Sequence, residues 1–214
     1  MRRFVHLVVM ALLTAVPTVA SAQTAPGRSG SSSERTFVGG RQIWDDLNEF
    51  GECFAAQQTK DAIKLVTPEA GSMEEARVYK ALFSKDTACL GDLAGLSVPW
   101  QLVRGSVGEG FYKKGVPVPP NLAFPRDLAP DKVKSVMDAA TCYAGHHPGD
   151  ARTLIEHTKP DSKEQEAALD AHWRDFVACL PPNMPAGFKF DTLLLRYRIA
   201  EALWRMGYVR GQAL

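Results

Sequence analysis

The side chains in this sequence that could do chemistry are four cysteines, four histidines after residue 22, and two similar pairs of arginine and glutamate. Two stretches of similar sequence each begin and end with a cysteine, from Cys53 to Cys89 and from Cys142 to Cys179. No two cysteines have CxxC spacing, so the chain lacks the minimal motif of a thioredoxin-type redox site, a zinc ribbon or a covalent haem site. We therefore expect the cysteines to form structural disulfides.

The histidines lie in the second stretch, where they and Asp150 offer the nitrogen and oxygen donors that metal ions bind. The first stretch has glutamines at the positions of His146 and His147, and the sequence HHPG from residue 146 is typical of an exposed loop. His172 lies further along the same stretch. No metal and no cofactor are therefore expected. The alternative is a metal- or small-ligand-binding site, enzymatic or not, built from His146, His147, Asp150 and His157.

The arginine and glutamate pairs have the same spacing in both copies, Arg104 with Glu109 and Arg196 with Glu201. Such residues could bind an anionic ligand, or they could tie their helix to the rest of the bundle. Positions five apart face different sides of a helix and no nucleophile lies nearby, which favours the structural role. Arg198 adds a possible ion pair with Glu201 on the same helix. No GxSxG, HExxH or glycine-rich phosphate loop occurs, so we expect no catalytic residues.

Apolar residues at helical spacing predict four helices around each pair of cysteines. The second helix of each copy is expected to be capped by its aspartate, Asp61 or Asp150, and the third to begin with a capping box. Six aromatic residues are expected to pack inward, namely Trp44, Trp100, Trp173 and Trp204, with Phe83 and Phe111. The helices are predicted at residues 40–57, from 61, from 72 and over 103–113, and again at 131–145, from 150, from 162 and over 195–205; the capping boxes are Ser72 with Glu75 and Ser162 with Gln165.

These elements predict an all-α fold of two tandem helical repeats, each of about four helices and each clipped by one disulfide. Four cysteines allow three connectivities, and the duplication favours Cys53 with Cys89 and Cys142 with Cys179 because it carries each pair as a unit. The repeats are expected to pack through their fourth and first helices. Three glycines in the first copy of the fourth helix should weaken it unless a neighbour packs closely, or they form a seam for another molecule. They are Gly105, Gly108 and Gly110.

Residues 1–22 have the charged start, apolar stretch and small-residue cleavage site of a secretory signal peptide. Cleavage before Gln23 leaves 23 basic against 24 acidic side chains, a near-neutral balance that favours neither nucleic acid nor an anionic membrane as partner. No membrane span is expected after cleavage. The predicted organisation is a flexible leader at 23–39, repeat one at 40–114, a proline-rich linker at 115–130 and repeat two at 131–210. The compartment is expected to be periplasmic or secreted.

The repeated order Cys-[Phe/Tyr]-Ala, Asp-Ala, Ala-Cys-Leu, then Arg with Glu five residues on, resembles uncharacterised secreted bacterial helical-repeat proteins. The resemblance covers about Ile43 to Trp204 and implies the same fold, one disulfide per repeat and an exported protein. It implies no activity, cofactor or catalytic residue. We expect an exported, non-catalytic helical protein that acts as a binding or interaction module of the cell envelope, with a protein or a small ligand as partner.

Overall fold

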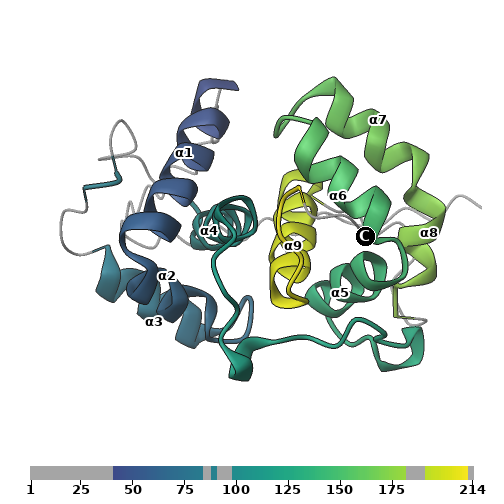
Figure 1. Cartoon of the computed structure of the whole chain (residues 1–214), viewed down its shortest axis with the longest axis horizontal. Coiled ribbons are helices and arrows are strands. Elements are labelled where there is room, and N and C mark those ends of the chain that lie inside the picture. Colours follow the sequence, from purple (N-terminus) through teal and green to yellow (C-terminus); the bar gives the residue numbers. More distant parts are fainter. Residues whose placement is uncertain (1–40, 84–87, 91–97, 182–190, 212–214) are drawn as a thin grey trace, which may run out of the picture. The chain divides into compact units, whose positions relative to one another are not determined.

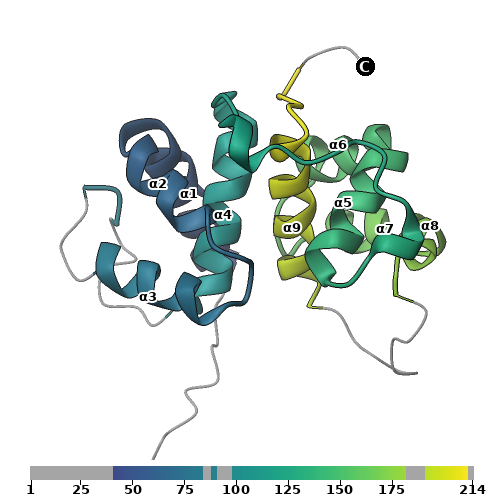
Figure 2. The ribbon, with the colours of Figure 1, turned by 90° about the horizontal axis from the view of Figure 1, so that it is seen from below.

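The chain folds into helices throughout the part that the computed structural model describes, which is residues 41–83, 88–90, 98–181 and 191–211 (Figures 1 and 2). These residues belong to one compact unit, and no strand occurs among them. The all-α class is therefore confirmed. None of the described helices is long and apolar enough to cross a membrane. The predicted signal peptide and leader lie outside the described residues.

The first half of the molecule is built on a long contact between its first and fourth helices. The two shorter helices pack against each other and against this pair. Phe50 and Phe54 of the first helix contact Phe83 at the end of the third, with ring centroids 5.6 and 5.5 Å apart. The four predicted helices are therefore present. They are α1 (Arg41–Gln57), α2 (Thr59–Val66), α3 (Met73–Leu82) and α4 (Trp100–Lys114).

The second half presents helices in the same order, with one difference. The predicted single third helix is broken at His172 into two pieces, so this half has five helices among the described residues. The first and second helices of this half pack on its last helix, as in the first half. The helices are α5 (Val136–His146), α6 (Pro148–His157), α7 (Lys163–Ala171), α8 (Trp173–Ala178) and α9 (Thr192–Arg205).

The two halves meet through α4 and α9, which lie side by side between them (Figure 1). This confirms the predicted contact between the fourth helices. The first helices do not meet each other in the same way, because α1 packs on α4 and α5 packs on α9. Trp204 of α9 is buried as expected, whereas Trp173 of α8 keeps 39% of its surface exposed and does not belong to the core.

The proline-rich linker runs from one half to the other with two short 3₁₀ turns, η2 (Pro120–Leu122) and η3 (Pro130–Lys132). The prediction that the first helix of repeat two begins near Asp131 is wrong, because α5 begins only at Val136. A capping box sets this start: the Ser135 hydroxyl accepts the amide of Asp138, and the Asp138 carboxylate accepts the amide of Ser135.

The predicted caps are present at the third helix of each half and absent at the second. Ser72 and Ser162 each accept the amide three residues on, as predicted for the third helices, at 3.1 Å. The Glu75 carboxylate reaches back to the amide of Gly71 rather than to Ser72. Asp61 and Asp150 cap nothing, because α2 and α6 begin at Thr59 and Pro148, before the aspartates.

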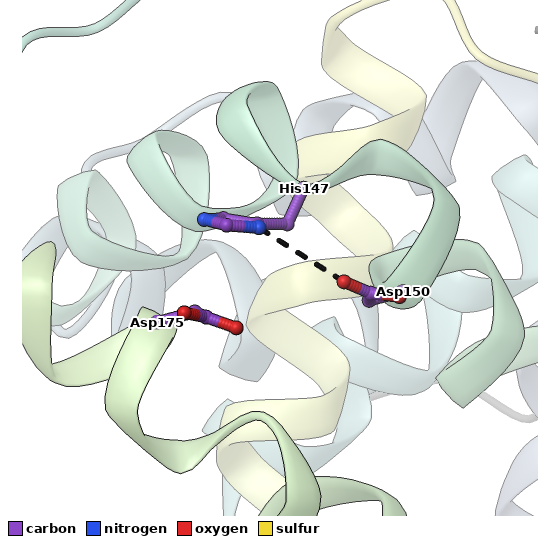
Figure 3. Close-up of side chains that lie close together, drawn as sticks. All are labelled: His147, Asp150 and Asp175. Atoms are coloured by element: carbon purple, nitrogen blue, oxygen red, sulfur yellow. Dashed lines mark ion pairs between the residues drawn. The ribbon is translucent and has the colours of Figure 1, made fainter.

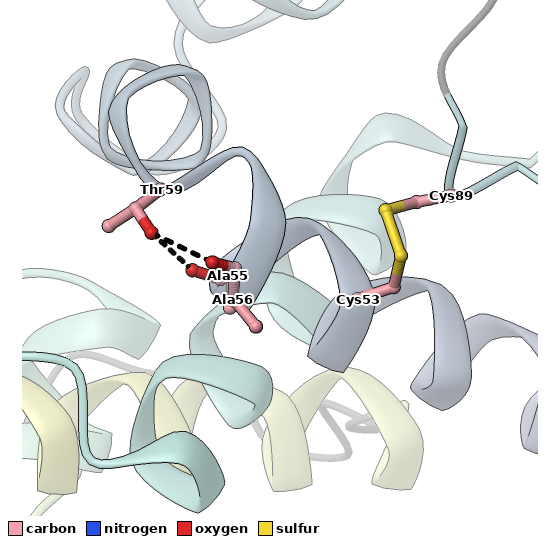
Figure 4. The surroundings of a disulfide bond; sticks show 5 residues. All are labelled: Cys53, Ala55, Ala56, Thr59 and Cys89. Carbon is pink, nitrogen blue, oxygen red and sulfur yellow. Dashed lines mark hydrogen bonds between the residues drawn. A yellow bond between two sulfur atoms is a disulfide. The ribbon is translucent and has the colours of Figure 1, made fainter.

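The disulfides join Cys53 to Cys89 (Figure 4) and Cys142 to Cys179, as the similarity of the two stretches predicted, with Cα atoms 5.6 and 5.7 Å apart. Each closes a loop of similar length, with sequence separations of 36 and 37 residues. The second disulfide joins α5 to the residue that ends α8. Each should contribute about 3 to 4 kcal/mol to stability through the unfolded chain.

The glycines of α4 are explained by close packing within the chain. A Cβ atom on Gly110 would lie 2.3 Å from the carbonyl oxygen of Gly51 in α1, and one on Gly105 would lie 2.4 Å from the Cβ of Tyr197 in α9. A Cβ atom on Gly108 would lie 2.9 Å from the Cβ of Glu201. The hypothesis of a glycine seam for another molecule is therefore wrong, because this chain itself covers the seam.

We predict that Gly110→Ala lowers the free energy of unfolding by about 1 to 3 kcal/mol, because the methyl group would collide with the backbone of α1. Helix propensity alone predicts the opposite sign, a gain of about 1 kcal/mol. Urea denaturation of the two proteins decides between these effects. Ala167→Gly on the exposed side of α7 is the control and should cost about 1 kcal/mol. A Gly110→Ala protein as stable as the parent would contradict the packing.

Candidate functional site

The arginine and glutamate residues of the fourth helices pair with each other across the seam between α4 and α9. Arg104 donates from Nε and Nη2 to the Glu201 carboxylate, at 3.0 and 2.7 Å. Arg196 donates in the same way to Glu109, at 3.0 and 2.9 Å. All four side chains are buried. The arrangement is reciprocal, since the arginine of each helix takes the glutamate of the other.

Each guanidinium also closes the end of the second helix in its own half. Arg104 donates to the carbonyl oxygens of Val66 and Pro68, at 2.9 and 2.7 Å. Arg196 donates to the carbonyl oxygens of Leu154 and Ile155, at 2.8 and 3.1 Å. The last carbonyls of a helix have no partner within it and carry partial negative charge, which suits a guanidinium. Each arginine therefore joins three helices.

Glu201 lies at the centre of the larger charge cluster. Arg198 and Arg205 contact its carboxylate from the same helix, at 3.3 and 3.0 Å, so the possible pair with Arg198 is present. Burial alone would raise the pKa of Glu201, but Arg104, Arg205 and Arg198 together hold this pKa well below its usual range. The carboxylate stays ionised and balances several buried positive charges.

Glu109 has a smaller set of partners. Its carboxylate accepts the Lys113 ammonium at 2.8 Å in addition to Arg196. Burial would raise the pKa of Glu109, and Arg196 and Lys113 outweigh it, so that the pKa is lowered. Because Arg104 and Arg196 are buried and already paired with these carboxylates, the two guanidinium groups offer no place for an anionic ligand. The geometry gives Arg104, Glu109, Arg196 and Glu201 a structural role, and we refer to these four paired residues as the framework.

The histidines that the sequence singled out are separated by the fold. His146 and His157 are exposed and lie apart from the other candidate ligands. His147 approaches Asp150, and Asp175 of α8 lies beside both, so that one ligand atom from each falls within 4.8 Å of the others (Figure 3). His172 adds a second imidazole, whose Nδ1 lies 3.4 Å from the Asp150 carboxylate.

Sequence reasoning missed Asp175, although a signal was present. The sequence His-x-x-Asp occurs twice in the second stretch, at His147 with Asp150 and at His172 with Asp175. In each case the histidine immediately precedes a helix and the aspartate lies in its first turn. We refer to these four residues as the His-Asp cluster.

A surface hollow of about 260 Å³ lies beside the first disulfide. Its lining combines an apolar floor with the carboxylates of Asp46 and Glu49, which both belong to α1. A much smaller apolar cavity, about 30 Å³, shares Phe50 and Leu90 with it. We use the term apolar floor for the other lining residues of the hollow, which are Phe50, Cys53, Ala88, Cys89 and Leu90.

Comparisons with profiles of known protein families, with curated proteins and with solved structures find no match to this chain. The function is therefore inferred from the geometry of the framework, the hollow and the His-Asp cluster.

We predict that Glu201→Gln lowers the free energy of unfolding at neutral pH by about 3 to 5 kcal/mol, because it leaves buried arginines without their counter-charge. The pH dependence should also change. A depressed carboxyl pKa adds stability that is present above the unfolded value of about 4.3 and is lost as the pH falls towards the folded value. The parent should therefore lose stability steeply below about pH 4 to 5, and Glu201→Gln less steeply.

Denaturant titrations from pH 2 to 8 provide the measurement. Asp61→Asn is the matched control, because the pair of Asp61 with Lys64 is solvent-exposed and should contribute less than about 1 kcal/mol. Equal losses in the two variants would show that the cluster around Glu201 does not hold the halves together.

Proposed function

We propose that this protein is an exported, non-catalytic binding module of the cell envelope. Two disulfides support export, because they form and persist in oxidising compartments. The absence of a catalytic motif in the sequence supports a binding role. The buried arginines and glutamates of the framework also support it, because they are enclosed and paired with each other. We also propose that the halves arose by duplication and that the protein belongs with the secreted helical-repeat proteins that its motif resembles.

The hollow beside the Cys53–Cys89 disulfide is the observation that carries this proposal. Its apolar floor and two carboxylates match a group with an apolar stem and a positively charged end. A volume of about 260 Å³ is below the range of about 300 to 1,000 Å³ that is typical of small-molecule pockets. We infer that the hollow receives one lysine or arginine side chain from a partner protein.

The chemistry of such a side chain fits the lining. The methylene stem of a lysine or arginine packs on apolar surface while its charged end remains near water and carboxylates. Phe50 and Leu90 would contact the stem, and Asp46 and Glu49 would attract the charge. A single inserted side chain with surrounding weaker contacts is a common way for an interface to gain its affinity.

We predict that N-acetyl-lysine methylamide binds the hollow with a dissociation constant of about 1 mM, the weak affinity expected of one side chain. Amide resonances of Phe50, Cys53 and Leu90 should shift in a ¹⁵N-labelled protein titrated with this probe. N-acetyl-norleucine methylamide keeps most of the stem without the charge and should bind several-fold more weakly.

Variants then test the role of the two carboxylates. The double substitution Asp46→Asn with Glu49→Gln should remove the preference for the charged probe, because it neutralises both rim carboxylates. Asp45→Asn is the control, since Asp45 is an exposed carboxylate of the same helix outside the hollow. Equal shifts with both probes, or none at these residues, would refute a site for a basic side chain.

Export has its own measurement. Expressed in a bacterium with its native leader, the protein should be recovered from the periplasm or medium beginning at Gln23, because residues 1–22 have a signal-peptide pattern. Its mass should equal residues 23–214 less four hydrogens, which accounts for the two disulfides. An intact leader on a protein retained in the cytoplasm would refute export.

A further inference from the structure

The His-Asp cluster brings together four side chains from the starts of two helices. His147 and Asp150 belong to the start of α6, and His172 and Asp175 to the start of α8. The side chains are between about one third and one half exposed, with values from 34% to 45%. They are therefore held by the fold on one side and open to solvent on the other.

The carboxylate of Asp150 lies between the two imidazoles. Its Oδ2 atom is 3.9 Å from Nδ1 of His147 and 3.4 Å from Nδ1 of His172. The Asp175 Oδ2 atom is 3.9 Å from Nδ1 of His172. The donors of a tetrahedral zinc site are about 3.4 Å apart, given zinc-to-ligand bonds of about 2.0 to 2.2 Å. One donor atom from each of His147, Asp150 and Asp175 already lies within 4.8 Å of the others, and rotation of the exposed His172 side chain would have to bring in the fourth donor.

Tyr143 packs against one side of the cluster. It is only 3% exposed and its ring stacks on the His147 imidazole, with centroids 5.5 Å apart. Burial raises the pKa of this tyrosine, and the nearby charges of Asp150 and Asp175 raise it further. The ring therefore covers one face of the His147 imidazole.

We propose that His147, Asp150, His172 and Asp175 bind one zinc-class divalent metal ion. Two imidazoles and two carboxylates suit zinc and its neighbours, whereas magnesium and calcium prefer sites made almost entirely of oxygen. Cysteine thiolates do not compete, because all four cysteines are in disulfides.

The alternative role for these residues is local. Aspartates in the first turn of a helix stabilise it, and a histidine can form an ion pair with them. That role accounts for the contact within each His-x-x-Asp sequence, at 3.9 Å in both. It does not require Asp150 and Asp175 to approach each other, which costs electrostatic energy unless a cation lies between them.

The first half shows that the fold does not need this cluster. The offset between the halves is 89 residues at the first cysteines and 90 from Ser72 and Ser162 to the second cysteines, so Phe54, Gln58 and Leu82 occupy the positions of Tyr143, His147 and His172. Only Asp61 keeps the type of its counterpart, and it pairs with Lys64 at 2.7 Å. The metal ligands are therefore particular to the second half.

Metal binding would give the second half a second clip. The Cys142–Cys179 disulfide holds the end of α8 against α5, while the metal would hold its start against the junction of α5 and α6. The disulfide and the metal would therefore restrain both ends of α8, which has only six residues. A bound metal should therefore raise the melting temperature, as any ligand of the native state does.

The test uses the mature, disulfide-bonded chain without an affinity tag, freed of metal by chelation and dialysis. Calorimetric titration with Zn²⁺ should show one ion per chain and a higher melting temperature, and Co²⁺ should give the intense visible bands of a four-coordinate site. Asp175→Asn should weaken Zn²⁺ binding by at least about 100-fold, because it removes a direct ligand.

Controls separate the cluster from ordinary surface histidines. The double variant His146→Ala with His157→Ala should bind as the parent does, since both histidines are exposed and outside the cluster. His172→Leu tests the fourth ligand with the residue that the first half has at this position, in case Asp175→Asn does not fold. Binding that is lost in the control pair, or unchanged in every folded cluster variant, would overturn the proposal.

Discussion

The reciprocal pairing of Arg104 with Glu201 and of Arg196 with Glu109 is the interaction on which the rest of the structure depends. Removing these charges from water is costly, and the cost is offset only where every donor and acceptor finds a partner. The chain meets this condition by directing each guanidinium to a carboxylate of the opposite helix and to the carbonyl end of a helix in its own half. The relative position of the halves follows from this double requirement.

Close packing makes this pairing possible. Gly105 and Tyr197 occupy matching positions of the two fourth helices, and they meet across the seam. The missing side chain of one provides the space for the ring of the other, whose hydroxyl donates to Asn48 at 3.1 Å. Gly105 would weaken α4 in isolation, but its missing side chain allows the close contact between α4 and α9. The stability of α4 comes from tertiary contacts rather than from helix propensity.

The two places suited to binding lie outside this framework, each near a disulfide. The first half has a hollow with an apolar floor and two carboxylates beside Cys53–Cys89. The second half has the His-Asp cluster, whose helix α8 ends at Cys179. The disulfides restrain the segments that carry these side chains, so that a ligand would lose less entropy in ordering them. The two halves thus combine similar architecture with different surface chemistry.

The sequence by itself determined the helical class, the pairing of cysteines and the serine caps of the third helices. These features follow from local spacing, from side-chain bonds to nearby amides and from the conservation of a pattern within one chain. It also identified the framework arginines and glutamates as a set. Two predictions from the sequence were wrong. The start of α5 was predicted five residues early, because competing caps are weak local signals. Trp173 was expected to be buried, because the break at His172 is also a weak local signal.

Only the tertiary structure decided which arginine meets which glutamate, why α4 contains glycines, and that Asp150 lies beside Asp175. Each of these depends on contacts between residues far apart in sequence, with separations of 97 and 87 for the two ion pairs. Helical periodicity states which face a side chain occupies but not which helix lies opposite. Partners across a seam are set by the packing of whole helices, which no local pattern in the sequence contains.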